Sequence, residues 1–301
     1  MQTMQNNNNP TNLFALVDDE DTPIRRIPLT AALNTELVQL FVAQQTTLLN
    51  DRQPIAFTGS YNVDEGEIFT IADYPLPPTI GQAIGNPLTC QVLDLNTETH
   101  RIKALFSGTW TEANKAVNFQ VFDSGKLLKR GYTLIGSGDT YKKLEEPGLM
   151  LQYKLTAHFH NGILYFTSYH NTKRFLDLSD YYREATDTDL DNFAATELFA
   201  FEDEAGFKEQ ADSIIRKKIA LLQKNEVLKN LTVTDIQIVA NNFNAELPQE
   251  HHIAITVNDD GDLVIPKDKK QLKELIRFLD EDYVTAPLTK RKCLTNSKQY
   301  L

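Results

Sequence analysis

Three of the six histidines in this sequence lie within sixteen positions, in the stretch LTAHFHNGILYFTSYH at residues 155–170. Imidazole nitrogens are common zinc ligands, and three of them brought together could hold a catalytic Zn²⁺. The spacing therefore raises the question of whether His158, His160 and His170 form a metal site.

The residues around these histidines favour a β-hairpin. Asn161-Gly162 lies between two runs of alternating apolar and polar residues, which is typical of a two-residue type I′ turn. This turn sets a register in which His158 faces Tyr165. Because side chains alternate along a strand, His158 and His160 share the more polar face of the hairpin and His170 points to the other face. The three imidazoles then cannot meet on one ion, so we predict a hairpin, with no metal and no cofactor.

Acidic residues offer a second candidate for metal chemistry. Asp187, Asp189 and Asp191 resemble the start of a calcium-binding loop, but Asn192 stands where that loop needs glycine and Leu198 where it needs a bidentate glutamate. We therefore expect these acids to lie at the start of a helix, where negative charge is favourable.

A third arrangement has the ingredients of a metal-dependent nuclease. Asp262 and Asp268 could hold Mg²⁺ and Lys270 could stabilise developing negative charge. Pro266 ends the strand between the two acids, which suits rigid metal binding poorly. No nucleophile elbow and no complete phosphate-gripping loop occurs elsewhere. The lack of these motifs in the sequence favours a protein that is not an enzyme. The nuclease stays open as an alternative.

The composition is that of a folded protein. The chain has 301 residues, of which 41% are hydrophobic and 24% charged. No apolar run is long enough for a membrane-spanning helix. Residues 1–12 are polar and lack the features of a signal peptide, so we predict a disordered leader. Cys90 and Cys293 are far apart, which favours two reduced thiols in a cytoplasm.

The hydrophobic pattern predicts helices and antiparallel strands. A helix over 30–49 has Thr30 as its N-cap and a stripe of Leu33, Leu37, Leu40 and Phe41. The segments 13–17, 90–95, 102–108 and 116–123 alternate as half-buried strands do. Further helices are expected within 207–231 and 268–284, and a second hairpin within 252–265. We predict an α+β fold of two closely packed halves, 13–118 and 119–301.

The charge is unevenly distributed along the chain. The net charge is −11, which argues against non-specific attraction to nucleic acid, yet residues 266–301 hold nine basic and five acidic side chains. This basic end could be a local anion site or an ordinary solvated helix. Arg216, Lys217 and Lys218 are most simply the solvated face of an amphipathic helix.

The same C-terminal part carries a resemblance to a known family. Leu279-Asp280-Glu281-Asp282-Tyr283, Ala286-Pro287-Leu288-Thr289 and Asn296-Ser297-Lys298 follow one another as in the KwaB proteins of the Kiwa anti-phage defence system. The stretch at 161–178 is also similar in layout. The resemblance extends over about residues 120–301, and it rests on the order of the motifs, since each motif is short.

This resemblance implies a cytoplasmic protein that binds phage or replicating DNA, beside a small membrane partner, KwaA, that recruits it to the inner face of the cell membrane. It also implies a homodimer and brings no catalytic residues. In an acidic chain the phosphates must be met by a localised set of cations, and binding should weaken steeply with salt. We expect the set to be Lys267, Lys269, Lys270, Lys290, Arg291, Lys292 and Lys298, with a second patch at Lys126, Lys129 and Arg130.

Three functions remain open from the sequence. The first is a non-enzymatic DNA-binding component of a defence system. The second is an interaction or scaffold subunit whose acidic surface binds a basic partner, with little DNA binding. The third is the metal-dependent nuclease.

Overall fold

The Asn161-Gly162 turn forms as the sequence predicts. In the computed structural model, which describes residues 12–98, 101–295 and 297–298, β12 (Ala157–His160) pairs antiparallel with β13 (Ile163–Phe166). His158 lies opposite Tyr165. The backbone φ is 45° at Asn161 and 93° at Gly162, as a type I′ turn requires. The predicted hairpin and its register are confirmed.

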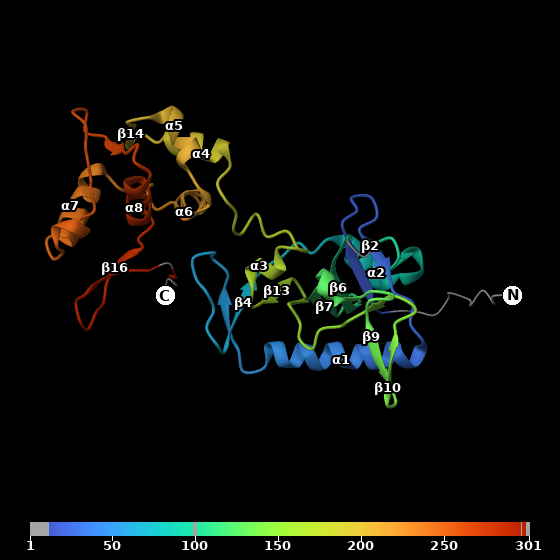
Figure 1. Cartoon of the computed structure of the whole chain (residues 1–301). Helices are drawn as coiled ribbons and strands as arrows, with labels where there is room; N and C mark the ends of the chain where they lie inside the picture. Colours follow the sequence, from blue (N-terminus) through green and yellow to red (C-terminus); the bar gives the residue numbers. More distant parts are fainter. Residues whose placement is uncertain (1–11, 99–100, 296, 299–301) are drawn as a thin grey trace. The chain divides into compact units, whose positions relative to one another are not determined.

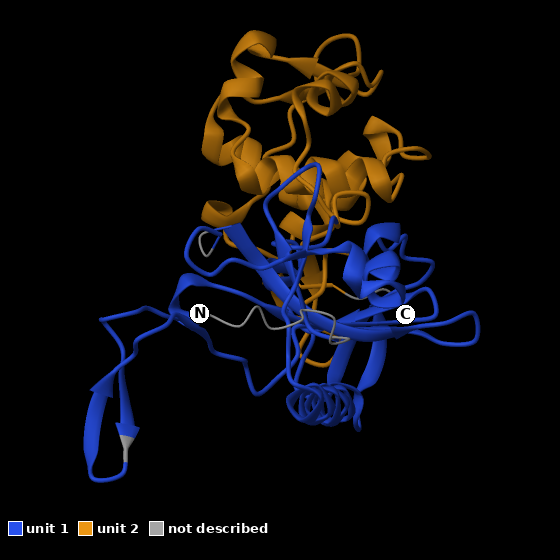
Figure 2. Cartoon of the chain, turned by 90° about the vertical axis from the view of Figure 1, so that its right-hand side faces the viewer, with its two compact units in different colours: residues 1–57, 63–177 blue, residues 58–62, 178–301 orange. Residues whose placement is uncertain are grey.

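The described chain divides into two units (Figures 1 and 2). Each unit has its own hydrophobic core. Unit 1 takes residues up to 57 together with 63–177, and unit 2 takes 58–62 together with 178–301. Helices occur in both units, and the strands pair mostly in antiparallel fashion, which confirms the α+β class. The predicted leader lies outside the described residues, apart from Asn12.

The predicted boundary near residue 118 falls in the middle of unit 1. It lies within β7 (Lys115–Val121), which pairs with β6 (Ile102–Trp110) along its whole length, from Trp110↔Lys115 to Ala104↔Val121. A cut there would separate two neighbouring strands of one sheet. The structure divides the chain after Asp177 instead.

Unit 1 is built on a large sheet. Among the described residues the sheet has nine strands in the order β3-β4-β13-β12-β7-β6-β1-β2-β5. The remaining members are β1 (Phe14–Val17), β2 (Ile24–Arg26), β3 (Gln53–Ala56), β4 (Glu67–Ile71) and β5 (Gln91–Val92). All neighbours are antiparallel except the two outermost pairs, β3–β4 and β2–β5.

Helix α1 (Ala31–Leu49) packs on one face of this sheet. The Thr30 side chain accepts a hydrogen bond from the Leu33 backbone N–H, so the predicted N-cap is confirmed. Phe41 and Leu48 enter the core of unit 1. The predicted stripe is partly wrong, because Leu33 is 42% exposed. The buried face of the helix also contains a glutamine, Gln44.

Buried amides explain why this helix can bury a glutamine. The Gln44 side chain donates to the Gln152 carbonyl at 2.8 Å and accepts from Gln120 at 2.7 Å. Gln120 in turn accepts from the Gln152 backbone N–H at 2.9 Å. Both buried glutamine side chains are thus hydrogen-bonded, which offsets the penalty for taking their amides out of water.

His158 belongs to the same polar layer and is fully buried. Its Nδ1 lies 2.7 Å from the Asn118 Oδ1, so Nδ1 carries the proton and donates it. Burial, together with the nearby His160, lowers the pKa of His158 to about 4. The expectation of a polar face was correct for this strand, but that face looks toward protein and not toward solvent.

The other face of the sheet is covered by α2 (Pro78–Gly85) and by aromatic side chains. Pro78 begins this helix, a position that proline suits because it needs no N–H partner there. The Phe14 and Phe106 rings stack at 5.0 Å. The ring of Trp110 lies against Gly81, where a Cβ would fall 2.2 Å from Cε2.

Smaller elements complete unit 1. They are α3 (Tyr169–Thr172), the turns η1 (Pro87–Thr89) and η3 (Ser124–Lys126), the pair β8 (Leu127–Leu128) with β11 (Gly148–Leu149), and the hairpin of β9 (Leu134–Ser137) with β10 (Thr140–Lys143).

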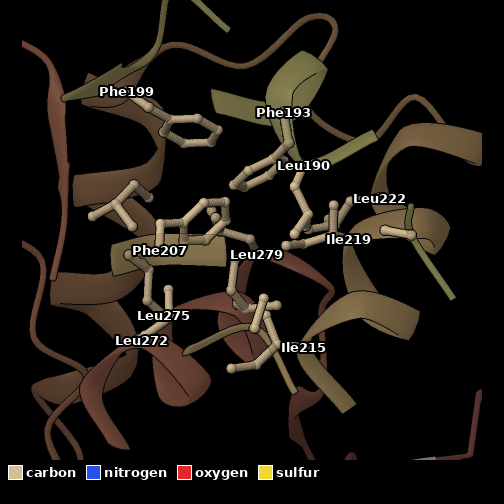
Figure 3. Close-up of a cluster of buried hydrophobic side chains, with 14 of the residues drawn as sticks. Leu190, Phe193, Phe199, Phe207, Ile215, Ile219, Leu222, Leu272, Leu275 and Leu279 are labelled. Atoms are coloured by element: carbon tan, nitrogen blue, oxygen red, sulfur yellow. The ribbon is translucent and has the colours of Figure 1, made fainter. Parts of the chain in front are cut away.

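Unit 2 is mainly helical, and its core is drawn in Figure 3. Its elements are α4 (Asp187–Ala194), β14 (Phe199–Phe201), α5 (Glu204–Gln210), α6 (Ser213–Lys224), α7 (Val233–Asn244), η4 (Gln249–His251), β15 (Leu263–Ile265), α8 (Lys269–Leu279), β16 (Tyr283–Thr285) and β17 (Lys292–Leu294). β14 and β15 form a short parallel pair. Ile215 and Ile219 of α6 meet Leu275 of α8 in the core.

The acids at 187–191 cap α4, as expected. The Thr186 side chain accepts from the Asp189 backbone N–H, and the Asp189 carboxylate accepts from Thr186 in return. Hydrogen bonds from Arg183 hold the pKa of Asp189 far below its usual value. Among the described residues, no helix combines the length and the hydropathy needed to cross a membrane.

The burial of His158 predicts a pH-dependent stability. His158 takes up a proton near pH 6.5 in the unfolded chain but only near pH 4 in the folded chain. Its neutral form therefore contributes fully to the free energy of unfolding above pH 6.5, and this contribution falls as the pH drops toward 4. The loss is on the order of 3 kcal/mol. Urea unfolding of the wild type and of His158→Phe across this range should show a shallower pH slope in the variant. His170→Gln, at an exposed site, should keep the wild-type slope; equal slopes in all three proteins would contradict this account.

The contact between Gly81 and Trp110 predicts a second stability effect. Gly81→Ala should destabilise the protein by about 1–3 kcal/mol because the new methyl group overlaps the indole ring. Gly85→Ala, in the same helix with open space around it, should be neutral or stabilising, since alanine favours a helix more than glycine does. Thermal or urea unfolding of both variants checks this, and equal stability of the pair would refute the steric argument.

Candidate nucleic-acid interface

The β16–β17 hairpin carries two exposed cations of the predicted C-terminal set. Its turn is closed by hydrogen bonds between Ala286 and Arg291 and between Lys290 and Ala286, both 2.9 Å. Lys290 adopts a left-handed conformation with φ of 58°. Leu288, at the turn, is 94% exposed. Lys290 and Arg291 are exposed and make no ion pair with any described residue, so both charges face solvent.

The start of α8 presents three more of the predicted cations. Asp268 caps the helix by accepting from the backbone N–H groups of Lys270 and Gln271. Lys267, Lys269 and Lys270 are all exposed. Lys269 pairs with Asp212 at 3.2 Å, and Lys270 lies 4.0 Å from Glu274 with 86% of its side chain exposed. Such exposed pairs are weak, so these ammonium groups can exchange partners.

Lys292 is placed differently from its neighbours in sequence. Only 11% of its side chain is exposed, and its ammonium group pairs with Glu246 at 3.1 Å. It also lies 4.8 Å from the centre of the Phe243 ring. Lys292 and Lys270 line the same pocket of about 450 Å³, together with Tyr283, whose hydroxyl pKa is raised by burial.

Lys298 lies in a buried cluster of charges in unit 2. Its ammonium group is 3.0 Å from Asp280 and 3.2 Å from Asp282, and it also donates to the Asp280 carbonyl. Lys218 of α6 contacts the same two carboxylates at 2.8 and 2.7 Å. Arg277 completes the cluster at 4.0 Å from Asp282. We call these five residues the Asp280–Asp282 cluster.

The carboxylates of the Asp280–Asp282 cluster are paired with cations of the same cluster. Asp282 is fully buried and Asp280 is 3% exposed, while their three cationic neighbours more than neutralise them. Neither Asp282 oxygen accepts a well-directed hydrogen bond from the described residues, so its lysine contacts are ion pairs held by charge. A pocket of about 200 Å³ borders the cluster, with Ser60 and Tyr182 among its lining residues.

This arrangement corrects the sequence analysis of α6. The prediction of a solvated basic face is wrong for Lys218, which is 13% exposed and belongs to the cluster. It is also wrong for Arg216, whose guanidinium group donates to the carbonyls of Ala185 and Ala211 and contacts Asp187 at 2.8 Å. The α8–β16 connection contains the D-x-D spacing that could have suggested such a cluster, but nothing in the sequence pairs it with Lys218.

The second predicted patch lies in unit 1, on the turn that follows β7. Lys126 is half-buried in η3, whereas Lys129 and Arg130 are exposed. The side chains of Lys129 and Arg130 make no ion pair with any described residue. They lead directly into the β9–β10 hairpin.

The residues considered for metal chemistry have structural contacts. Asp268 is the N-cap of α8, and the Asp262 side chain accepts from Asn258 at 3.2 Å. Within the described residues, no three His, Cys, Asp or Glu side chains gather in a way that could hold a metal ion.

The chain matches the sequence model of a known protein family. The model described as "Kiwa protein KwaB-like" matches residues 116–289, which is more than half of the chain. The chain belongs to the KwaB-like family. Membership implies the context of Kiwa anti-phage defence, a system of several components. Neither the curated proteins nor the solved structures contained a match.

The KwaB-like region does not coincide with either unit. It begins at residue 116, inside β7 of unit 1, and ends in the β16–β17 turn of unit 2. The match therefore includes the β9–β10 hairpin, Asp280 and Asp282. It ends at Thr289, directly before Lys290, and does not include Lys298.

The buried cluster predicts a large loss of stability in one variant. Asp282→Asn removes one charge and leaves Lys218 and Lys298 with a single buried carboxylate, so unit 2 should lose about 3–5 kcal/mol. Urea unfolding followed by far-UV circular dichroism measures this. Asp259→Asn, in an exposed turn, serves as the control and should be neutral. An unchanged unfolding midpoint in Asp282→Asn would show that the ion pairs do not stabilise this unit.

Proposed function

We propose that this chain is a non-enzymatic, DNA-binding component of a Kiwa defence system. It acts in the cytoplasm as a homodimer beside a KwaA-like membrane protein, which recruits it to the inner face of the cell membrane. The observation that carries the DNA-binding part is the pair of unpaired, exposed cations at the β16–β17 turn, in a family that belongs to anti-phage defence.

The chemistry of the exposed cations fits phosphate rather than base contacts. Lysine acts as a point charge and arginine can hold two phosphate oxygens at once. Such contacts orient DNA but carry little sequence information. The proposed interface of unit 2 consists of the exposed members of the predicted set, Lys267, Lys269, Lys270, Lys290 and Arg291. Lys292 and Lys298 are held by ion pairs and would stabilise this surface instead of contacting phosphates. Lys129 and Arg130 of unit 1 are the exposed members of the separate, second patch.

The second candidate function is an interaction subunit with little DNA binding. The net charge of −11 supports it, because most of the surface repels a polyanion and attracts a basic partner. Few phosphates can be neutralised by so small a basic surface. If DNA is bound, we therefore expect moderate affinity with a strong salt dependence.

Salt-dependent binding tests the proposal. Lys290→Gln/Arg291→Gln should weaken binding of labelled duplex DNA, and the slope of log affinity against log salt should become shallower by about 2, since each phosphate contact contributes about 0.9. Fluorescence anisotropy across a salt series measures both quantities. Glutamine is chosen to remove charge without adding repulsion, and Lys292 is left in place because it supports the hairpin.

The control is Lys229→Gln, an exposed lysine that is paired with Glu226. It should leave the salt slope unchanged. Retention of full affinity by the double variant would move the interface away from this turn. If the wild type binds no DNA even at low salt, the chain is the interaction subunit. DNA that stays intact in Mg²⁺ is expected; cleavage that Asp268→Ala abolishes would favour the nuclease.

A further inference from the structure

The β9–β10 hairpin, together with the segment 126–133 that leads into it, exposes side chains that folding normally hides. Tyr132 is 90% exposed, Tyr141 76% and Leu134 61%. Figures 1 and 2 show the hairpin extending away from the sheet of unit 1. An isolated two-stranded hairpin gains little stability from itself, and exposed apolar side chains gathered in one place mark an interaction surface.

The hairpin and the segment that leads into it also form a basic stretch in an acidic chain. Residues 126–143 contain five basic side chains and one acidic side chain, against a net charge of −11 for the whole. Lys129, Arg130, Lys142 and Lys143 are exposed and make no ion pair with any described residue. Their charges are therefore available to an anionic partner.

The strand register places an aromatic ring and a cation on one face. Tyr141 lies opposite Gly136, and Lys143 lies opposite Leu134. Residues that face each other across a ladder, and those two apart in a strand, share a face, so Tyr141, Lys143 and Leu134 lie together. Gly136 has no side chain, and a Cβ there would meet nothing within 4 Å. The side of Tyr141 that faces Gly136 is thus left open.

We infer that the β9–β10 hairpin is a platform for single-stranded DNA, on which Tyr132 and Tyr141 stack against bases while Lys129, Arg130, Lys142 and Lys143 pair with phosphates. This inference rests on the proposed DNA-binding function and assigns it a second contact with a different preference. Aromatic faces can stack only on bases that are not enclosed in a duplex. An acidic protein would use the cations equally well, but it would not need two exposed rings beside them.

Binding of labelled single-stranded oligothymidine, compared with a duplex of the same length, tests the inference. Tyr132→Ala/Tyr141→Ala should lower the affinity for the single strand roughly tenfold or more and leave duplex affinity unchanged. Tyr132→Phe/Tyr141→Phe keeps both rings and should bind as the wild type does. Tyr153→Ala, which removes another tyrosine of unit 1 that is 87% exposed, is the matched control and should have no effect.

A crosslinking measurement on the wild type makes the test independent of any variant's folding. An oligonucleotide with 5-bromodeoxyuridine should form photoadducts on Tyr132 or Tyr141, identified by peptide mass spectrometry. If DNA is bound but the alanine variant keeps its single-strand affinity and no adduct forms in the hairpin, the inference is overturned and the proposed function stands. If neither form of DNA is bound, both are overturned, and the hairpin's cations then point to an acidic protein.

Discussion

Unit 2 depends on the ion pairs that two buried aspartates make with lysines from distant parts of the chain. Asp280 is the C-cap of α8 and Asp282 lies directly before β16, while Lys218 comes from the middle of α6 and Lys298 from the last described segment. Neither aspartate would be tolerated in this environment alone, because an unpaired buried carboxylate is strongly destabilising. The lysines therefore have to be in place for this part of unit 2 to pack. Two of the motifs that carry the resemblance to the KwaB proteins supply Asp280, Asp282 and Lys298 to this contact.

The same cluster explains how a short segment from the N-terminal half enters unit 2. The backbone N–H of Lys298 donates to the Ser60 carbonyl at 2.7 Å, and the Asn62 N–H donates to the Ser297 hydroxyl at 3.2 Å. Gly59, with φ of 80°, approaches the Tyr182 ring so closely that a Cβ would fall 2.3 Å from it. Residues 58–62 are thus held by the segment that the ion pairs anchor. The path of the chain between β3 and β4 is consequently part of unit 2 although both strands belong to unit 1.

The sequence predicts what local chemistry decides and misses what distant contacts decide. The Asn161-Gly162 hairpin and the Thr30 cap depend on neighbouring residues, so both were correct. The boundary near 118 lies within β7 because the pairing of β6 with β7, which no composition change marks, continues the sheet. Lys218 looked like a surface lysine because its partners are 62 residues away along the chain. The candidate interface follows the same rule, since the sequence locates basic residues but not the carboxylates that remove some of them from the surface.

The cations of this acidic protein therefore fall into two classes, those that are buried in ion pairs and those that are exposed and unpaired. Lys218, Lys298 and Lys292 lie among carboxylates and pack the interior, where their charge is already balanced. Lys290 and Arg291 lie at the β16–β17 turn, and Lys142 and Lys143 lie in the β9–β10 hairpin. All four are exposed and make no ion pair with any described residue. A projecting hairpin keeps its positive charge away from the acidic surface, and within about 8 Å at physiological salt that distance decides whether a polyanion is attracted or repelled. The DNA contacts proposed above would use only the second class of cations.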